Sequence, residues 1–123
     1  GVMNGYSGGN VPNEDWLVSK EIDLSGYSDI NLTFDSDVRY NGNPLRLFIT
    51  ENFTGDPNAT TWTELTNEAN WDPTTTAYGF VSSGNVSLAS FANKKVRIAF
   101  KYVSTSSAAN TWEIDNIKVK AKP

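Results

Sequence analysis

An aspartate near the end of the chain occupies the position that says most about possible chemistry. In the segment 112–119, strand alternation places Asp115 in phase with Ile117 and Val119, so we expect its carboxylate to point into the core. A buried carboxylate is costly unless it is hydrogen-bonded, paired with a cation or bound to a metal ion. Candidate partners are backbone N–H groups, Arg97 or a lysine, and a hard oxygen-ligated ion such as Ca²⁺. A metal ligand and a structural carboxylate are equally open interpretations.

Two other acidic pairs are candidates for metal binding or catalysis. Glu14 and Asp15 are adjacent at the start of a predicted strand, so they point to opposite faces and one of them can join Asp115 in a metal site. The simpler interpretation is that Glu14 and Asp15 are ordinary polar residues at the start of the strand. Asp35 and Asp37 lie two apart in a strand and share a face about 7 Å apart. That separation suits a glycoside hydrolase, although a solvated strand face is the more ordinary explanation.

Four aromatic residues in or beside predicted loops form a candidate platform for stacking sugars. They are Trp62, Trp71, Tyr78 and Tyr40. Aromatic side chains in a sandwich more often belong to the core, and that alternative stays open for each of them.

The composition removes several classes of function. The 123 residues include neither cysteine nor histidine, which excludes disulfides, zinc sites and imidazole-based catalytic triads within this chain. The net charge of −4 and the pI near 4.6 argue against nucleic acid and anionic membranes as partners. Runs of apolar residues stay well short of the roughly 18 needed to span a bilayer, so we expect no membrane insertion.

Alternation with a period of two residues predicts an all-β domain. The spacing indicates about eight strands, as in an antiparallel jelly-roll β-sandwich, with a single domain over 1–123. A short helical turn is expected near Pro57–Thr60. The expected strands lie near residues 15–19, 29–37, 45–50, 61–65, 78–82, 84–88, 95–103 and 111–119.

The two ends of the chain raise the question of sheet edges. Residues 1–14 are rich in Gly and Asn, which predicts either that they form a loop packed across the sandwich or that an edge strand preceding them is missing. Lys118, Lys120 and Lys122 alternate along the last strand and are typical of a charged edge. An unpaired edge would favour self-association through strand pairing.

Short motifs follow one another through most of the chain in a fixed order. They are NEDWLVS at 13–19, EIDLS at 21–25, LTF at 32–34, LRLFIT at 45–50, GD at 55–56, TWTEL at 61–65, VRIAFKY at 96–102 and WEIDNI at 112–117. In this order the chain resembles the choice-of-anchor J, or cleaved-adhesin-like, domains of Bacteroidetes-type bacteria.

The resemblance implies a jelly roll related in shape to MAM-type and carbohydrate-binding modules, located outside the cell or on its surface. It also implies a structural calcium, with Asp115 and either Glu14 or Asp15 in the matching positions. Two departures from the pattern matter for that site. Lys20 stands where the family has Pro, and the upstream strand region is largely absent before Gly1, which leaves the N-terminal ligand set open.

These observations predict a non-catalytic accessory module that binds a glycan or protein ligand. One alternative is a spacer domain without a ligand, which would bury Trp62 and Trp71. The other is a glycoside hydrolase using Asp35 and Asp37, which requires both carboxylates on one concave face.

Overall fold

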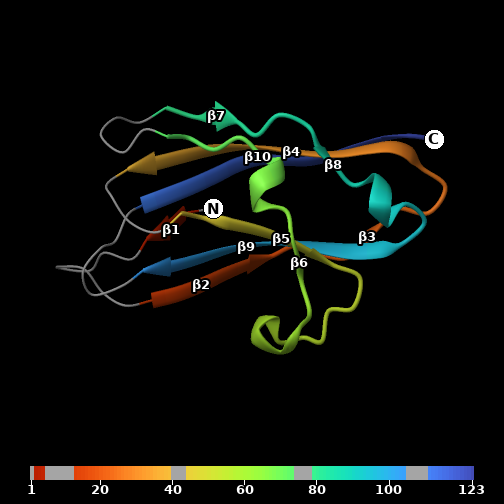
Figure 1. Cartoon of the computed structure of the whole chain (residues 1–123), viewed down its shortest axis with the longest axis horizontal. Helices are drawn as coiled ribbons and strands as arrows, with labels where there is room; N and C mark the ends of the chain where they lie inside the picture. The colour runs from red at the N-terminus through yellow and green to blue at the C-terminus, as the bar shows by residue number, and fades with distance from the viewer. Residues whose placement is uncertain (1, 5–12, 40–43, 74–78, 105–110) are drawn as a thin grey trace.

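The alternating segments form ten strands in the computed structural model, which describes residues 2–4, 13–39, 44–73, 79–104 and 111–123. The strands are β1 (Val2–Asn4), β2 (Asn13–Val18), β3 (Ile22–Asp23), β4 (Ser28–Arg39), β5 (Arg46–Thr50), β6 (Thr63–Glu64), β7 (Val81–Ser82), β8 (Val86–Ser87), β9 (Lys95–Ser104) and β10 (Thr111–Lys122). Three short 3₁₀ helices join them: η1 (Pro57–Ala59), η2 (Thr66–Glu68) and η3 (Ala89–Phe91). The long strands run along the long axis of the molecule (Figure 1).

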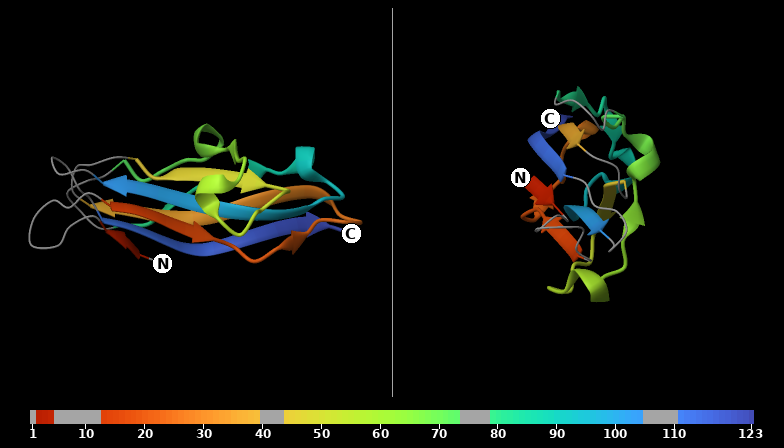
Figure 2. Two further views of the ribbon diagram at one scale, coloured as in Figure 1. Left: turned by 90° about the horizontal axis from the view of Figure 1, so that it is seen from below. Right: turned by 90° about the vertical axis from the view of Figure 1, so that its left-hand side faces the viewer.

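The strands are divided between two antiparallel sheets (Figures 1 and 2). Sheet I has the order β1-β10-β4-β7, with β8 also paired to β4. Sheet II has the order β2-β9-β5-β6, with β3 also paired to β9. The longest contact joins β10 to β4, from Thr111 opposite Arg39 to Lys122 opposite Ser28.

The core lies between the inner faces of the two sheets. In β4 the even-numbered residues from Ile30 to Val38 are buried, whereas Asn31, Thr33 and Asp35 are only partly covered on the outer face. Phe34 of sheet I meets Phe100 of sheet II edge-on, with ring centroids 5.0 Å apart. Burying such aliphatic and aromatic side chains supplies most of the folding free energy.

The all-β sandwich predicted from alternation is confirmed, and the helical turn near Pro57 is present as η1. Two short strands, β1 and β3, were not predicted, because two or three residues carry too little periodicity. The jelly-roll connection of the strands stays a prediction. Among the described residues, no helix has the length and apolar character needed to cross a membrane.

Candidate functional site

A groove on the outer face of sheet I is the candidate binding site. Its volume is about 380 Å³, and it runs over β10, β4 and the segment that joins β7 to β8. Side-chain amides, hydroxyls, a carboxylate and two amines dominate its walls. The lining residues are Thr33, Phe34, Asp35, Ser82, Gly84, Asn85, Asn116, Lys118 and Lys120.

A β-bulge in β10 shapes one wall of this groove. Between Asp115 and Lys118 the strand has one residue more than β4 does between their partners, and Asn116 adopts a positive φ of 51°. Before the bulge the buried side chains are Trp112 and Ile114, whereas beyond it the inward side chain is Val119. The bulge therefore changes which alternate side chains of β10 face the core.

The bulge overturns the prediction that Asp115 is buried. Asp115 is exposed because it precedes the bulge. Its side chain follows the alternation of the residues before the bulge, and not that of Ile117 and Val119 beyond it. Its Oδ1 accepts a hydrogen bond from the backbone N–H of Asn116 at 2.8 Å. The Asn116 side chain in turn donates from Nδ2 to Oδ2 of Asp35 at 2.8 Å. These two bonds fix Asn116 at the wall of the groove.

The floor of the groove depends on Ser83, which lies between the two short strands β7 and β8. Its N–H donates to the carbonyl of Phe34 at 2.8 Å, and its Oγ accepts from the Phe34 N–H at 2.9 Å. Gly84 follows with a φ of 68°, where a Cβ would lie 3.1 Å from Nδ2 of Asn70. A side chain at Gly84 would therefore be both strained and crowded, so a glycine suits the turn that presents Asn85 to the groove.

Asp35 and Asp37 share the outer face of β4, but only one of them lines the groove. Asp37 is 4% exposed, and its Oδ1 accepts a hydrogen bond from the Gly79 N–H at 3.1 Å. Across the strand pair, Asp37 faces Glu113 and Asp35 faces Asp115. The two carboxylates therefore do not present themselves together to a ligand in the groove, as a two-carboxylate hydrolase needs.

The residues predicted to bind calcium lie on different sheets. Glu14 and Asp15 belong to β2 in sheet II, whereas Asp115 belongs to β10 in sheet I. Glu14 accepts a hydrogen bond from Nε1 of Trp16 at 3.0 Å and lies 3.9 Å from Nζ of Lys101. Within the part of the chain that the structure describes, no three acidic residues form a group that could hold a metal ion. The calcium site stays a prediction.

Trp62, a predicted ligand platform, belongs to an aromatic cluster on the outer face of sheet II. This aromatic cluster consists of Trp16, Phe48, Phe53 and Trp62. The rings of Trp16 and Trp62 stack with centroids 5.4 Å apart, and Phe48 is only 7% exposed beneath them. Trp62 also donates from Nε1 to the carbonyl of Pro57 at 2.9 Å, and the amine of Lys101 lies 4.9 Å from the Trp16 ring centroid. These contacts hold the η1 segment against the sheet.

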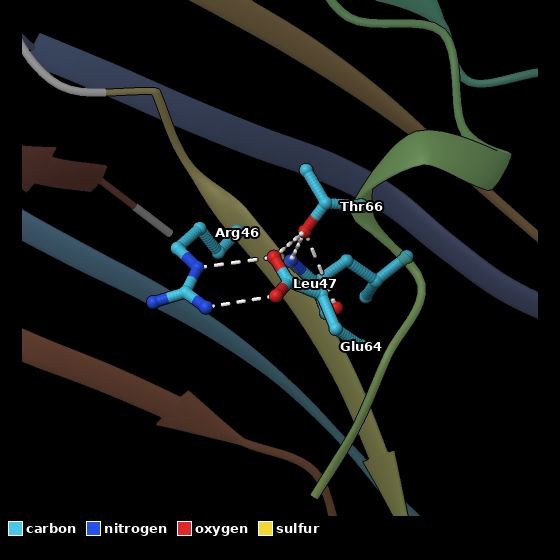
Figure 3. A network of polar contacts seen from close by, with 4 residues as sticks. All are labelled: Arg46, Leu47, Glu64 and Thr66. Carbon is cyan, nitrogen blue, oxygen red and sulfur yellow. Dashed lines mark hydrogen bonds and ion pairs between the residues drawn. The ribbon is translucent and has the colours of Figure 1, made fainter.

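A polar network beside this cluster joins β5 to β6 and η2 (Figure 3). Arg46 donates from Nε and a terminal nitrogen to the two oxygens of Glu64 at 3.0 and 2.8 Å. The Thr66 hydroxyl donates to Glu64 at 2.8 Å and accepts from the Leu47 N–H at 2.9 Å. The hydrogen bonds from Arg46, and to a smaller extent the bond from Thr66, lower the pKa of Glu64 from its usual 4.5 to about 2.

Of the other three aromatic candidates, only Trp71 lies in the described part of the chain. Trp71 packs against the core, with its ring centroid 5.1 Å from that of Phe34 and 5.9 Å from that of Trp112, and it donates from Nε1 to the Thr66 carbonyl at 2.9 Å. The core alternative is therefore correct for Trp71. Tyr40 and Tyr78 lie outside the described residues.

The sequence reasoning did not select Asn85, Asn116 or Ser83. The turn sequence Ser-Ser-Gly-Asn at 82–85 and the Asp-Asn pair at 115–116 were the available signals, because Asn adopts positive φ more readily than most residues.

The chain matches one protein-family model over residues 3–123, described as a domain of unknown function, DUF5017. No protein with a curated description matches it.

Proposed function

Because the chain belongs to the DUF5017 family, whose function is unknown, we propose its function from the groove: a non-catalytic module that binds a glycan. The observation that carries the proposal is the polar lining of this groove, in which amide, hydroxyl, carboxylate and amine groups converge. Sugar hydroxyls both donate and accept hydrogen bonds, so a wall that offers both kinds of partner suits them. The volume of about 380 Å³ falls in the range of small-ligand sites.

The chemistry of the walls favours a glycan over an apolar ligand. Asp35 and Asn116 are already oriented by their mutual hydrogen bond, so little ordering is needed when a ligand binds. Lys118 and Lys120 form no ion pair with a described residue, and their amines are available to donate to ligand oxygens. Asn85 is exposed at the opposite wall and adds an amide.

Catalysis is not part of the proposal. Asp37 is covered and bonded to the Gly79 N–H, so Asp35 and Asp37 are not accessible together as the two carboxylates of a glycoside hydrolase. The resemblance to choice-of-anchor J domains supports the remainder of the proposal, an accessory module of a secreted or cell-surface protein.

Isothermal titration against a panel of neutral and acidic oligosaccharides tests this function with two matched variants. Asn85→Ala removes an exposed amide from the groove, and we expect about a tenfold loss of affinity, the worth of one good hydrogen bond. Asn67→Ala removes an exposed amide from η2, and this variant should bind like the parent protein. Equal loss in both variants, or none in either, contradicts the groove as the site. Absence of binding across the panel favours the spacer alternative.

A further inference from the structure

A second pocket lies on the outer face of sheet II, where β9 begins beside β3 and β5 ends (Figure 1). Its volume is about 290 Å³. Lys95 and Arg97 line it from β9 and, being two residues apart, share one face of that strand. Asn52 and Phe53 line it from the segment that follows β5. The glycan groove belongs to sheet I, so the two sites are separate.

The guanidinium of Arg97 is held in place by neutral groups. Its Nη1 donates a hydrogen bond to the Ser19 carbonyl at 3.1 Å, and its central carbon lies 5.1 Å from the centroid of the Phe53 ring. These contacts orient a side chain that is only partly exposed. Its Nε and its second terminal nitrogen form no hydrogen bond within the described part of the chain, so both can donate to a ligand.

Two other cations, Arg46 and Lys101, stack on aromatic rings of the same outer face, and each has a carboxylate beside it. Arg46 is paired with Glu64 at 2.8 Å, and Nζ of Lys101 lies 3.9 Å from Glu14. Arg97 has the aromatic contact but no ion pair with any described residue. A partly covered guanidinium without a counter-charge favours the binding of an anion.

The charges around the pocket leave room for one negative charge on the ligand. Lys95 is exposed and, like Arg97, has no ion pair with a described residue. Glu51 in the wall is neutralised by Lys94 at 2.9 Å, and Glu21 contributes one further carboxylate. Two positive charges and one negative charge leave a single net positive charge. That balance suits a carboxylate better than a phosphate, whose charge is about −2.

The remaining groups of the pocket favour a sugar acid over an acidic peptide. The fork of Arg97 matches a planar carboxylate, and Glu21 and the Asn52 amide can bond the hydroxyls around it. Val96 is buried and the Phe53 ring is stacked with Arg97, so the pocket offers little apolar surface to a peptide side chain.

We propose that this pocket binds the carboxylate of a uronic acid, with Arg97 as its bidentate partner and Lys95 as the second cation. The site is independent of the glycan groove, because it uses other residues on the other sheet.

Titration of the ¹⁵N-labelled protein with methyl β-glucuronide and methyl β-glucoside tests this proposal. The two ligands differ only in a carboxylate against a hydroxymethyl group. We expect the glucuronide to give saturable amide shift changes at Asn52, Phe53 and Arg97, with an affinity that falls as salt is added. The glucoside should bind there at least about tenfold more weakly, because it lacks the charge-assisted hydrogen bonds.

Three variants locate the interaction. Arg97→Gln should lose about tenfold or more in affinity for the glucuronide, and Lys95→Gln, which removes an exposed charge, about threefold. Arg46→Gln is the matched control, because it removes a stacked arginine from the same face whose carboxylate partner is already present in the chain. It should bind within about twofold of the parent. Thermal unfolding checks that each variant is folded, and Lys95→Gln tests the site even where Arg97→Gln is destabilised.

Asn85→Ala separates this site from the glycan groove, and glucuronide binding that is unchanged in that variant supports the pocket on sheet II. Four results would overturn the proposal. They are equal affinity of Arg97→Gln and Arg46→Gln, parent-like affinity of Lys95→Gln, shift changes confined to the groove on sheet I, and binding of the glucoside or of acetate as tight as that of the glucuronide.

Discussion

The bulge at Asn116 makes a quantitative prediction about stability. Replacing Asn116 by Ala places a Cβ-bearing residue without a local hydrogen-bonding side chain at a φ of 51°, which costs about 1 kcal/mol. It also removes the exposed hydrogen bond to Asp35, worth about 0.5 kcal/mol. We therefore expect Asn116→Ala to lower the free energy of unfolding by about 1.5 kcal/mol.

Glycine at the same position separates the two contributions. Asn116→Gly loses the side-chain bond but adopts positive φ without steric cost, so we expect it to lose about 0.5 kcal/mol, about a third of the destabilisation of the alanine variant. Urea denaturation of both variants, with Asn67→Ala as an exposed control, measures the difference. If the alanine variant is as stable as the glycine variant or as the parent protein, the backbone at Asn116 does not impose the bulge, and this prediction is wrong.

Two further predictions concern sheet II: the Glu64 network and the aromatic cluster at Trp62. The Glu64 pKa is depressed to about 2, so the stability it contributes is present above about pH 4.5 and is lost as the pH falls towards 2. Both partners are over 40% exposed, so solvent screening reduces this contribution to about 1 kcal/mol. Glu64→Gln should lose that amount at neutral pH and unfold with a shallower acid dependence in urea titrations, and a curve parallel to the parent's would contradict this. Trp62→Ala should lose about 2 kcal/mol of stability, and Trp62→Phe should lose about half as much. The glycan affinity of both variants should stay within about twofold of the parent's. A large loss of glycan affinity would identify the aromatic cluster as the ligand platform.

Local alternation was sufficient to predict most of the sandwich. In β4 the apolar residues Ile30, Leu32 and Phe34 recur at every second position, and the structure buries each of them. The side chains between them lie on the outer face, and Asp35 and Asp37 share that face as their spacing predicted, although Asp37 is buried there. Strands of two residues, such as β3, contain no such repeat and depend on their contact with β9.

The prediction that Asp115 is buried was wrong because it continued the strand alternation unchanged through a β-bulge. An inserted residue reverses the inward and outward positions of all the residues that follow it in the strand. The hydrophobic pattern does not reveal the insertion when apolar residues stand both before and after the bulge, as Ile114 and Ile117 do. The Asp-Asn pair at 115–116 is a weak local sign of positive φ. The groove beside it depends on long-range pairing of Ser83 with Phe34, which the sequence order alone does not specify.

The measurement that tests the central proposal most directly is a titration of the ¹⁵N-labelled protein with the oligosaccharide panel, followed by backbone amide shifts. We expect saturable shift changes confined to the walls of the groove, above all at Thr33, Asn85 and Asn116, for at least one glycan. Shift changes centred on the aromatic cluster at Trp16 and Trp62, or no change with any glycan, would contradict it.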